Sequence, residues 1–132
     1  MTSQNPALLA PGERRSPESE PQPGGRVVDR LENIVRVFGS DSAAAAALDV
    51  SRAQPRRWRE GQVPDPENRD RIVGLDAVLA LLSGYLEAST IPKWLNGING
   101  HLGNRRPINV LRDGRLSEVI AAIEAEKSGA FT

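Results

Sequence analysis

Apolar residues recur at helical spacing along most of this chain, in segments that glycine and proline separate, and this pattern restricts the possible fold most strongly. No segment alternates apolar and polar residues as a half-buried strand would. The first helix is expected to begin near Arg26 and to end before Gly39, because glycine favours a helix C-terminus. Its apolar face comprises Val28, Leu31, Ile34, Val35 and Phe38. The expected fold class is all-α.

Two short helices are expected next. Ser40 and Asp41 are candidate N-caps for the alanine-rich segment 42–50, which has high helix propensity. Ser51 is a candidate N-cap for the following helix, which Gly61 would end. Short polar side chains accept hydrogen bonds from the free N–H groups of a first helical turn, so these positions predict where each helix starts.

The longest helix is expected at about residues 67–88. Asp65 can cap it, and Pro66 suits its first position. Its apolar stripe comprises Ile72, Leu75, Val78, Leu79, Leu82 and Leu86. This helix would offer the largest single apolar surface to a core.

The remainder of the chain is loop-like and rich in glycine until a last helix at about 116–127, which Gly129 would end. A short helical turn is expected at about 108–111. The expected hydrophobic anchors of the loop-like part are Trp94, Leu95, Ile98 and Leu102. The inner face of the last helix comprises Leu116, Val119, Ile120 and Ile123.

Length and charge limit the number of domains and the kind of partner. A chain of 132 residues, 39% of them hydrophobic, is long enough for one modest core. The 17 basic and 17 acidic residues cancel, so affinity for a polyanion must come from local asymmetry of charge. Residues 1–25 hold five of the ten prolines and little that can pack, and they are expected to form a disordered tail.

The sequence argues against an enzyme. Cysteine is absent, His101 is the single histidine, and no glycine-rich phosphate loop or paired acid and base appears. No metal site and no cofactor are therefore expected. No apolar run approaches the roughly 20 residues of a membrane span, and no signal pattern is present. A cytoplasmic location is expected.

The segment around residues 44–58 has the pattern of a helix-turn-helix. Ala44 and Ala45 are small where two helices would cross, and Trp58 would anchor the inner face of the second helix. Leu48 and Val50 are candidate buried residues on either side of the turn. Asp49 occupies a turn position where glycine is commonest, and aspartate tolerates a left-handed backbone. A helical hairpin used only for packing or dimerisation is the alternative.

Five residues of the second helix would then face outward together. They are Ser51, Arg52, Ala53, Arg56 and Arg57. Arginine can contact DNA phosphates or hold guanine through two hydrogen bonds. These residues are the predicted DNA-binding site.

Pro55 bears on where that helix begins. In a helix that begins at Ser51, Pro55 would remove a hydrogen bond, and a valine there would be stabilising. In a helix that begins at Gln54, Pro55 lies in the first turn at little cost, and Arg52 and Ala53 belong to the preceding turn.

The order of residues in the C-terminal third resembles the antitoxins of the Xre/MbcA/ParS type, in which an Xre-like helix-turn-helix precedes a small toxin-binding domain. The matching series is Trp94, Leu95, Asn99, Leu102, Gly103, Pro107, Leu111, Gly114, Val119, Ile123, Gly129 and Phe131. The resemblance covers about residues 27–132. Within this type the MbcA branch is the most similar, on the strength of "RRPINVLRDG" and the final "SGAFT".

The resemblance implies a partner and a mechanism. Members neutralise a toxin of the RES class, which consumes NAD or uses it to modify a target, and many bind their own operator DNA. In the MbcA branch the C-terminal end enters the active site of the toxin and blocks access of NAD. Here that end would be Ser128, Gly129, Ala130, Phe131 and Thr132, with Phe131 as the anchor and the terminal carboxylate facing cationic groups. Further expected toxin contacts are Trp94, Arg105, Arg106 and Arg112, with the three arginines near that end.

The expected organisation is a tail at 1–25, a helix-turn-helix region at 26–66, a connecting helix at 67–88 and a toxin-binding module with its tail at 89–132. A homodimer, or a hetero-oligomer with the toxin, is the expected assembly. Two alternatives remain open: a solitary transcriptional regulator without a toxin, and an antitoxin whose helix-turn-helix no longer reads DNA. A RES-domain reading frame beside the gene would favour an antitoxin.

Overall fold

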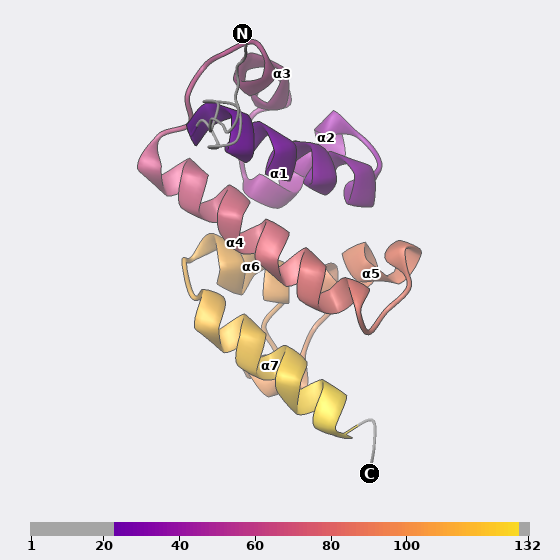
Figure 1. The fold of residues 1–132 in the computed structure, drawn as a ribbon. Coiled ribbons are helices and arrows are strands. Elements are labelled where there is room, and N and C mark those ends of the chain that lie inside the picture. Colours follow the sequence, from indigo (N-terminus) through magenta and orange to yellow (C-terminus); the bar gives the residue numbers. More distant parts are fainter. Residues whose placement is uncertain (1–22, 130–132) are drawn as a thin grey trace, which may run out of the picture.

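The described part of the chain is built from helices in an elongated arrangement (Figure 1). A computed structural model describes residues 23–129. Its elements are α1 (Pro23–Phe38), α2 (Asp41–Leu48), α3 (Gln54–Arg59), α4 (Pro66–Ser83), η3 (Ala88–Thr90), α5 (Ile91–Asn96), η4 (Gly100–Leu102), α6 (Pro107–Arg112) and α7 (Leu116–Gly129). Over these residues the all-α prediction is confirmed, since they contain no strand beyond an isolated bridge between Asn99 and Arg105.

Helix α4 runs between the N-terminal helices α1–α3 and the C-terminal helices α5–α7 (Figure 1). It contacts both groups, so one continuous hydrophobic core joins the two ends of the molecule. The fully buried members include Leu31, Ile34, Leu48, Ile72, Leu79, Leu82, Ile91, Leu95, Val110, Val119 and Ile123. The predicted DNA-binding residues and the predicted toxin-binding residues therefore lie on elements that share one core.

Local signals set the end of α1 and the start of α2 as expected. Gly39 has a φ of 100° and donates its N–H to the carbonyl of Val35 at 2.7 Å, which ends α1. The Ser40 hydroxyl accepts from the N–H of Ala43 at 3.0 Å and caps α2. Asp49 adopts the left-handed conformation, φ 61°, and turns the chain after α2.

Helix α3 begins at Gln54, and the expectation of a cap at Ser51 is wrong. The carbonyl of Ser51 accepts from the N–H of Gln54 at 3.0 Å in a turn, and Ala53 occupies the N-cap position without a side-chain bond. Pro55 lies in the first turn, where a backbone N–H has no partner within a helix. The premise on which valine at this position would be stabilising is therefore wrong.

The outer limits of two longer helices also differ from expectation. Helix α4 ends at Ser83, because the N–H groups of both Tyr85 and Leu86 turn back to the carbonyl of Leu82. Helix α1 begins at Pro23, so residues 23–25 are helical, whereas the rest of the predicted tail lies outside the described residues.

Helix α5 lies within the segment that was expected to be loop-like because it is rich in glycine, so the sequence did not predict this helix. Leu95 and Leu102 are buried anchors, as expected, and Trp94 is half-buried. Ile98 is not an anchor, because 65% of its surface is exposed. No helix within residues 23–129 combines the length and apolar character needed to cross a bilayer.

Candidate functional site

The predicted DNA-contacting residues lie in the turn before α3 and on its outer surface. Ser51, Arg52, Arg56 and Arg57 are exposed, whereas Ala53 is only half-exposed. Arg56 forms a loose ion pair with Glu60 at 3.9 Å, and neither Arg52 nor Arg57 has an ion pair within the described residues. Three guanidinium groups are therefore available at this surface.

The inner face of α3 fixes that surface to the core. Pro55 and Trp58 are both buried, with 3% of Trp58 exposed. Ala44 and Ala45 are fully buried in α2, which packs against α3. Leu48 is buried as expected, and Val50 is partly buried at the edge of the core.

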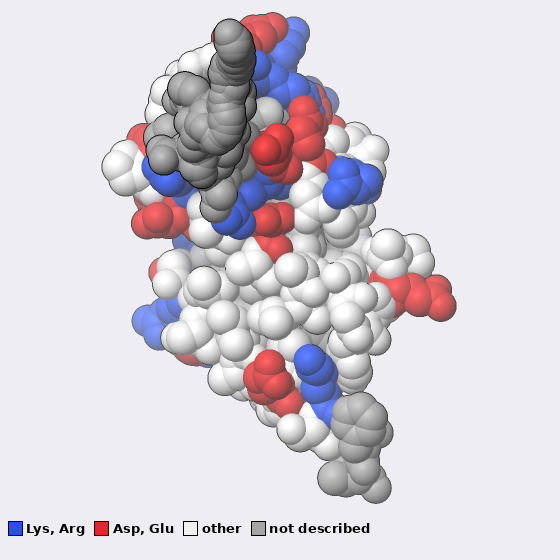
Figure 2. Space-filling view, viewed as in Figure 1, with Lys and Arg blue, Asp and Glu red and all other residues white. Residues whose placement is uncertain are grey.

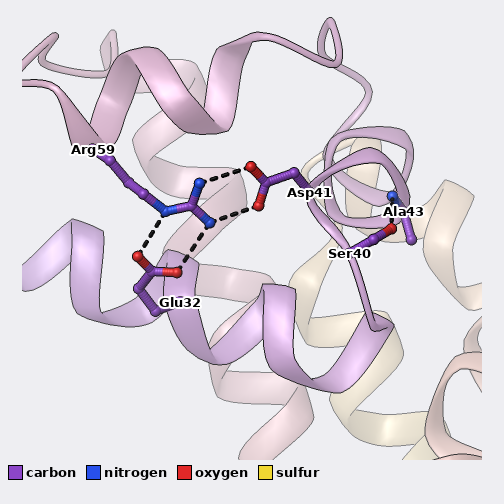
Figure 3. Close-up of polar contacts among 5 residues, drawn as sticks. All are labelled: Glu32, Ser40, Asp41, Ala43 and Arg59. Atoms are coloured by element: carbon purple, nitrogen blue, oxygen red, sulfur yellow. Dashed lines mark hydrogen bonds and ion pairs between the residues drawn. The ribbon is translucent and has the colours of Figure 1, made fainter.

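Arg59 differs from the other arginines of α3 because it is held between two carboxylates (Figure 3). Its Nε and Nη2 donate to Glu32 of α1 at 2.7 and 3.0 Å. Its Nη1 and Nη2 donate to Asp41 of α2 at 2.7 and 2.6 Å. One guanidinium thus ties three helices together through two bidentate pairs, and it is not free to contact a ligand.

The contact between Arg59 and Asp41 shifts the pKa of both groups. Its hydrogen bond to Asp41 holds the pKa of that carboxyl below the ordinary value of 3.8, against the opposing effect of burial. The same bond, with the one to Glu32, raises the pKa of the guanidinium. Asp41 and Arg59 are therefore both charged at neutral pH.

Trp94 and Glu126 join α5 to α7. The indole Nε1 donates to both carboxylate oxygens of Glu126 at 3.1 Å. Trp94 is half-buried, so part of its ring remains open to a partner. The predicted toxin contact at Trp94 is thus placed next to the C-terminal part of α7.

Arg105 and Arg106 directly precede α6, and both are exposed. Arg105 donates to Glu118 at 2.6 Å, and Arg106 donates to the carbonyl of Asn96. Two hydrogen bonds, the one from Arg115 with the larger effect and the one from Arg105, hold the pKa of Glu118 below its ordinary value. Glu118 lies in the first turn of α7, about 16 Å from Gly129 along the helix axis. Arg105 is therefore at the opposite end of α7 from the expected tail.

Arg112, the last residue of α6, reaches the other half of the molecule. Its Nε donates to the carbonyl of Ala47 at 3.3 Å, and its Nη2 donates to the carbonyl of Ala46. These carbonyls belong to the last turn of α2, where helix geometry leaves carbonyls short of donors, and that of Ala46 also accepts from the N–H of Asp49 at 3.2 Å. Arg112 thus serves as a cap for α2, a contact that sequence reasoning missed because it spans 65 residues.

The C-terminal segment divides at Gly129. Ser128 and Gly129 are exposed in the last turn of α7, two residues beyond the expected end of that helix. Ala130, Phe131 and Thr132 lie outside the described residues.

Charge is unevenly distributed on the face seen in Figure 2. Acidic and basic side chains mix over the end formed by α1–α3, and the middle of this face carries few charges. Within the described residues no cluster of three or more histidine, cysteine, aspartate or glutamate side chains could hold a metal ion.

Comparison with known proteins identifies the class to which this chain belongs. It is 34% identical over 109 residues to the probable mycobacterial cidal antitoxin Rv3188 of Mycobacterium tuberculosis, a match that covers 80% of this chain and 94% of that protein. It is also 34% identical over 87 residues to the mycobacterial cidal antitoxin MbcA of Mycobacterium bovis and Mycobacterium tuberculosis, covering 63% of this chain and 77% of MbcA. No protein-family model and no solved structure matches the chain. The protein is an antitoxin.

Within that class the chain belongs to the family of mycobacterial cidal antitoxins of the MbcA type. The resemblance drawn from the sequence is thereby confirmed. The two relatives are named as antitoxins, and their names do not specify a toxin target or a DNA sequence.

Proposed function

We propose that this antitoxin neutralises a RES-class, NAD-consuming toxin by direct binding, as a homodimer or in a hetero-oligomer with the toxin. The observation that carries the proposal is the match along 94% of a cidal antitoxin's length. An antitoxin of this family needs a toxin partner, and the series from Trp94 to Phe131 is the part of the sequence that resembles toxin-binding domains.

The proposed mechanism is entry of residues 128–132 into the toxin active site, with Phe131 as the apolar anchor. The geometry of α7 supports it. Val119, Ala122 and Ile123 hold that helix in the core, and its last turn is exposed at Ser128 and Gly129. A helix anchored in this way would fix the starting point of a short inhibitory segment, which lowers the entropic cost of binding.

Deletion of residues 130–132 tests the mechanism. The shortened antitoxin should keep its helical circular dichroism and its melting temperature, because it retains every buried core residue of the described part of the chain, of which Ile123 is the last. It should fail to prevent loss of NAD in a mixture with the toxin. Phe131→Leu is the matched control and should retain inhibition, since leucine keeps an apolar side chain. Full inhibition by the shortened chain would refute the mechanism.

We also propose that α2 and α3 form a helix-turn-helix that binds the operator of the antitoxin's own operon. The exposed guanidinium groups of Arg52, Arg56 and Arg57 support this proposal, together with the left-handed turn at Asp49. Ser51 and Ala53 precede α3 and would approach the phosphate backbone from the turn. A gel-shift titration with the promoter DNA, at several salt concentrations, is the test.

A further inference from the structure

We infer that the hollow between α5 and the C-terminal part of α7 is a docking surface for a segment of the toxin that carries an apolar side chain beside an acidic one. This inference rests on the proposed toxin partner. The hollow measures about 530 Å³, and its principal lining residues are Lys93, Trp94, Ile98, His101 and Glu126. We refer to it as the Ile98 groove.

Two large apolar side chains, those of Ile98 and Trp94, line the Ile98 groove. Ile98 is 65% exposed and lies with the half-buried Trp94 in the same hollow. In the described residues Val63 is the other large hydrophobic side chain exposed to this extent, at 72%, and it lies in the loop between α3 and α4. An exposed isoleucine beside an indole offers the apolar surface that typically anchors a protein interface.

The position of Ile98 is fixed before any partner binds. The buried Asn99 donates its N–H to the carbonyl of Arg105 at 3.1 Å and accepts from the N–H of His101 at 2.9 Å through Oδ1. A Cβ at Gly97 would lie 3.2 Å from the carbonyl of Lys93, so the chain passes close to α5 just before Ile98. A preformed anchor of this kind loses little conformational entropy on binding.

Charge and position indicate the occupant. Both oxygens of Glu126 accept from the Trp94 indole, whereas Lys93 has no ion pair within the described residues. The free ammonium of Lys93 suits a carboxylate on the incoming segment. Glu126 also lies two residues before Ser128, so a toxin that receives the C-terminal segment would stand directly beside the groove. The toxin is therefore the occupant that we assign.

The test compares two aspartate substitutions at similarly exposed sites. Ile98→Asp should weaken binding of the full-length antitoxin to the proposed RES-class toxin by at least about tenfold, because it removes an apolar anchor and places a carboxylate where the carboxylate of the partner would lie. Val63→Asp should change the affinity by less than about twofold. Biolayer interferometry measures the affinities, and circular dichroism checks folding. Lys93→Glu provides a second variant of the groove with the same expected direction.

The outcomes separate the groove from the function on which it depends. If wild-type antitoxin does not bind the toxin, the proposed function fails, and the groove fails with it. If wild type binds and both Ile98→Asp and Lys93→Glu bind equally well, the groove alone is refuted. If Ile98→Asp instead dissociates an antitoxin dimer in light scattering, with unchanged toxin affinity per chain, the occupant is a second copy and the inference is overturned.

Discussion

The double substitution Arg56→Ala with Arg57→Ala should lower the salt dependence of operator binding by a calculable amount. α3 and the turn before it carry four arginines, but Arg59 is held by Glu32 and Asp41, so three remain for phosphates. Each arginine that neutralises a phosphate contributes about 0.9 to the slope of log affinity against log salt concentration. The three together contribute about 2.7, and the double variant retains about 0.9 of this.

This difference is large enough to measure. Between roughly 50 and 200 mM salt, the three contacts would cost wild type about 40-fold in affinity, against about 3.5-fold for the double variant. Any further phosphate contacts add equally to both proteins and leave the difference in slope at about 1.8. Fluorescence anisotropy with labelled promoter DNA at five or more salt concentrations gives the slopes.

The control is Arg115→Ala, which removes an arginine with 60% of its side chain exposed at the start of α7. Its slope should equal that of wild type, because this residue directly precedes α7, and α7 and α3 lie on opposite sides of α4 (Figure 1). Equal slopes for wild type and the double variant would refute the assignment of Arg56 and Arg57 to phosphates. Binding by wild type that does not respond to salt would refute the DNA-binding proposal as a whole.

Two stability predictions concern the same helices. Arg59→Gln should lower the free energy of unfolding at pH 7 by about 1–2 kcal/mol in urea titrations, because it breaks two bidentate pairs that are partly exposed. The folded pKa of Asp41 is below 3.8, so the stability from its pair with Arg59 is present above that pH and is lost as pH falls through the folded pKa. The difference in stability between the variant and wild type should therefore narrow under acid, and a difference that stays constant while the Asp41 carboxyl becomes protonated would contradict the assignment. Pro55→Val should lower the free energy of unfolding by about 0.5–1 kcal/mol, because the proline fits the first turn of α3 and restricts the unfolded chain. A higher melting temperature for this variant would mean that Pro55 strains the native backbone.

Features set by neighbouring residues could be predicted from the sequence. Ser40 and Asp65 cap α2 and α4, and Gly39 ends α1, because each acts on backbone groups within four residues. The apolar periodicity of α4 likewise identified five of its buried side chains: Ile72, Leu75, Val78, Leu79 and Leu82.

Features that depend on long-range contacts could not be predicted in this way. Arg59 and Arg52 look alike in sequence, and only the packing of α1 and α2 brings two carboxylates to Arg59. Ile98 was expected in the core because it is apolar. Asn99, however, is buried, because its side chain caps η4, and the neighbouring Ile98 is left exposed.

The bond from Arg112 to the end of α2 has a consequence for exchanging parts between antitoxins. A C-terminal module transplanted onto a foreign N-terminal part would keep this bond only if the last turn of the foreign α2 lay in the same place, since the acceptors are the backbone carbonyls of residues 46 and 47. The graft would also divide a core in which α4 packs against both α1 and α7. A working chimera would therefore need to keep the packing of α2, α4 and α6 against one another, so the proposed DNA-binding and toxin-binding parts are not expected to be exchangeable independently.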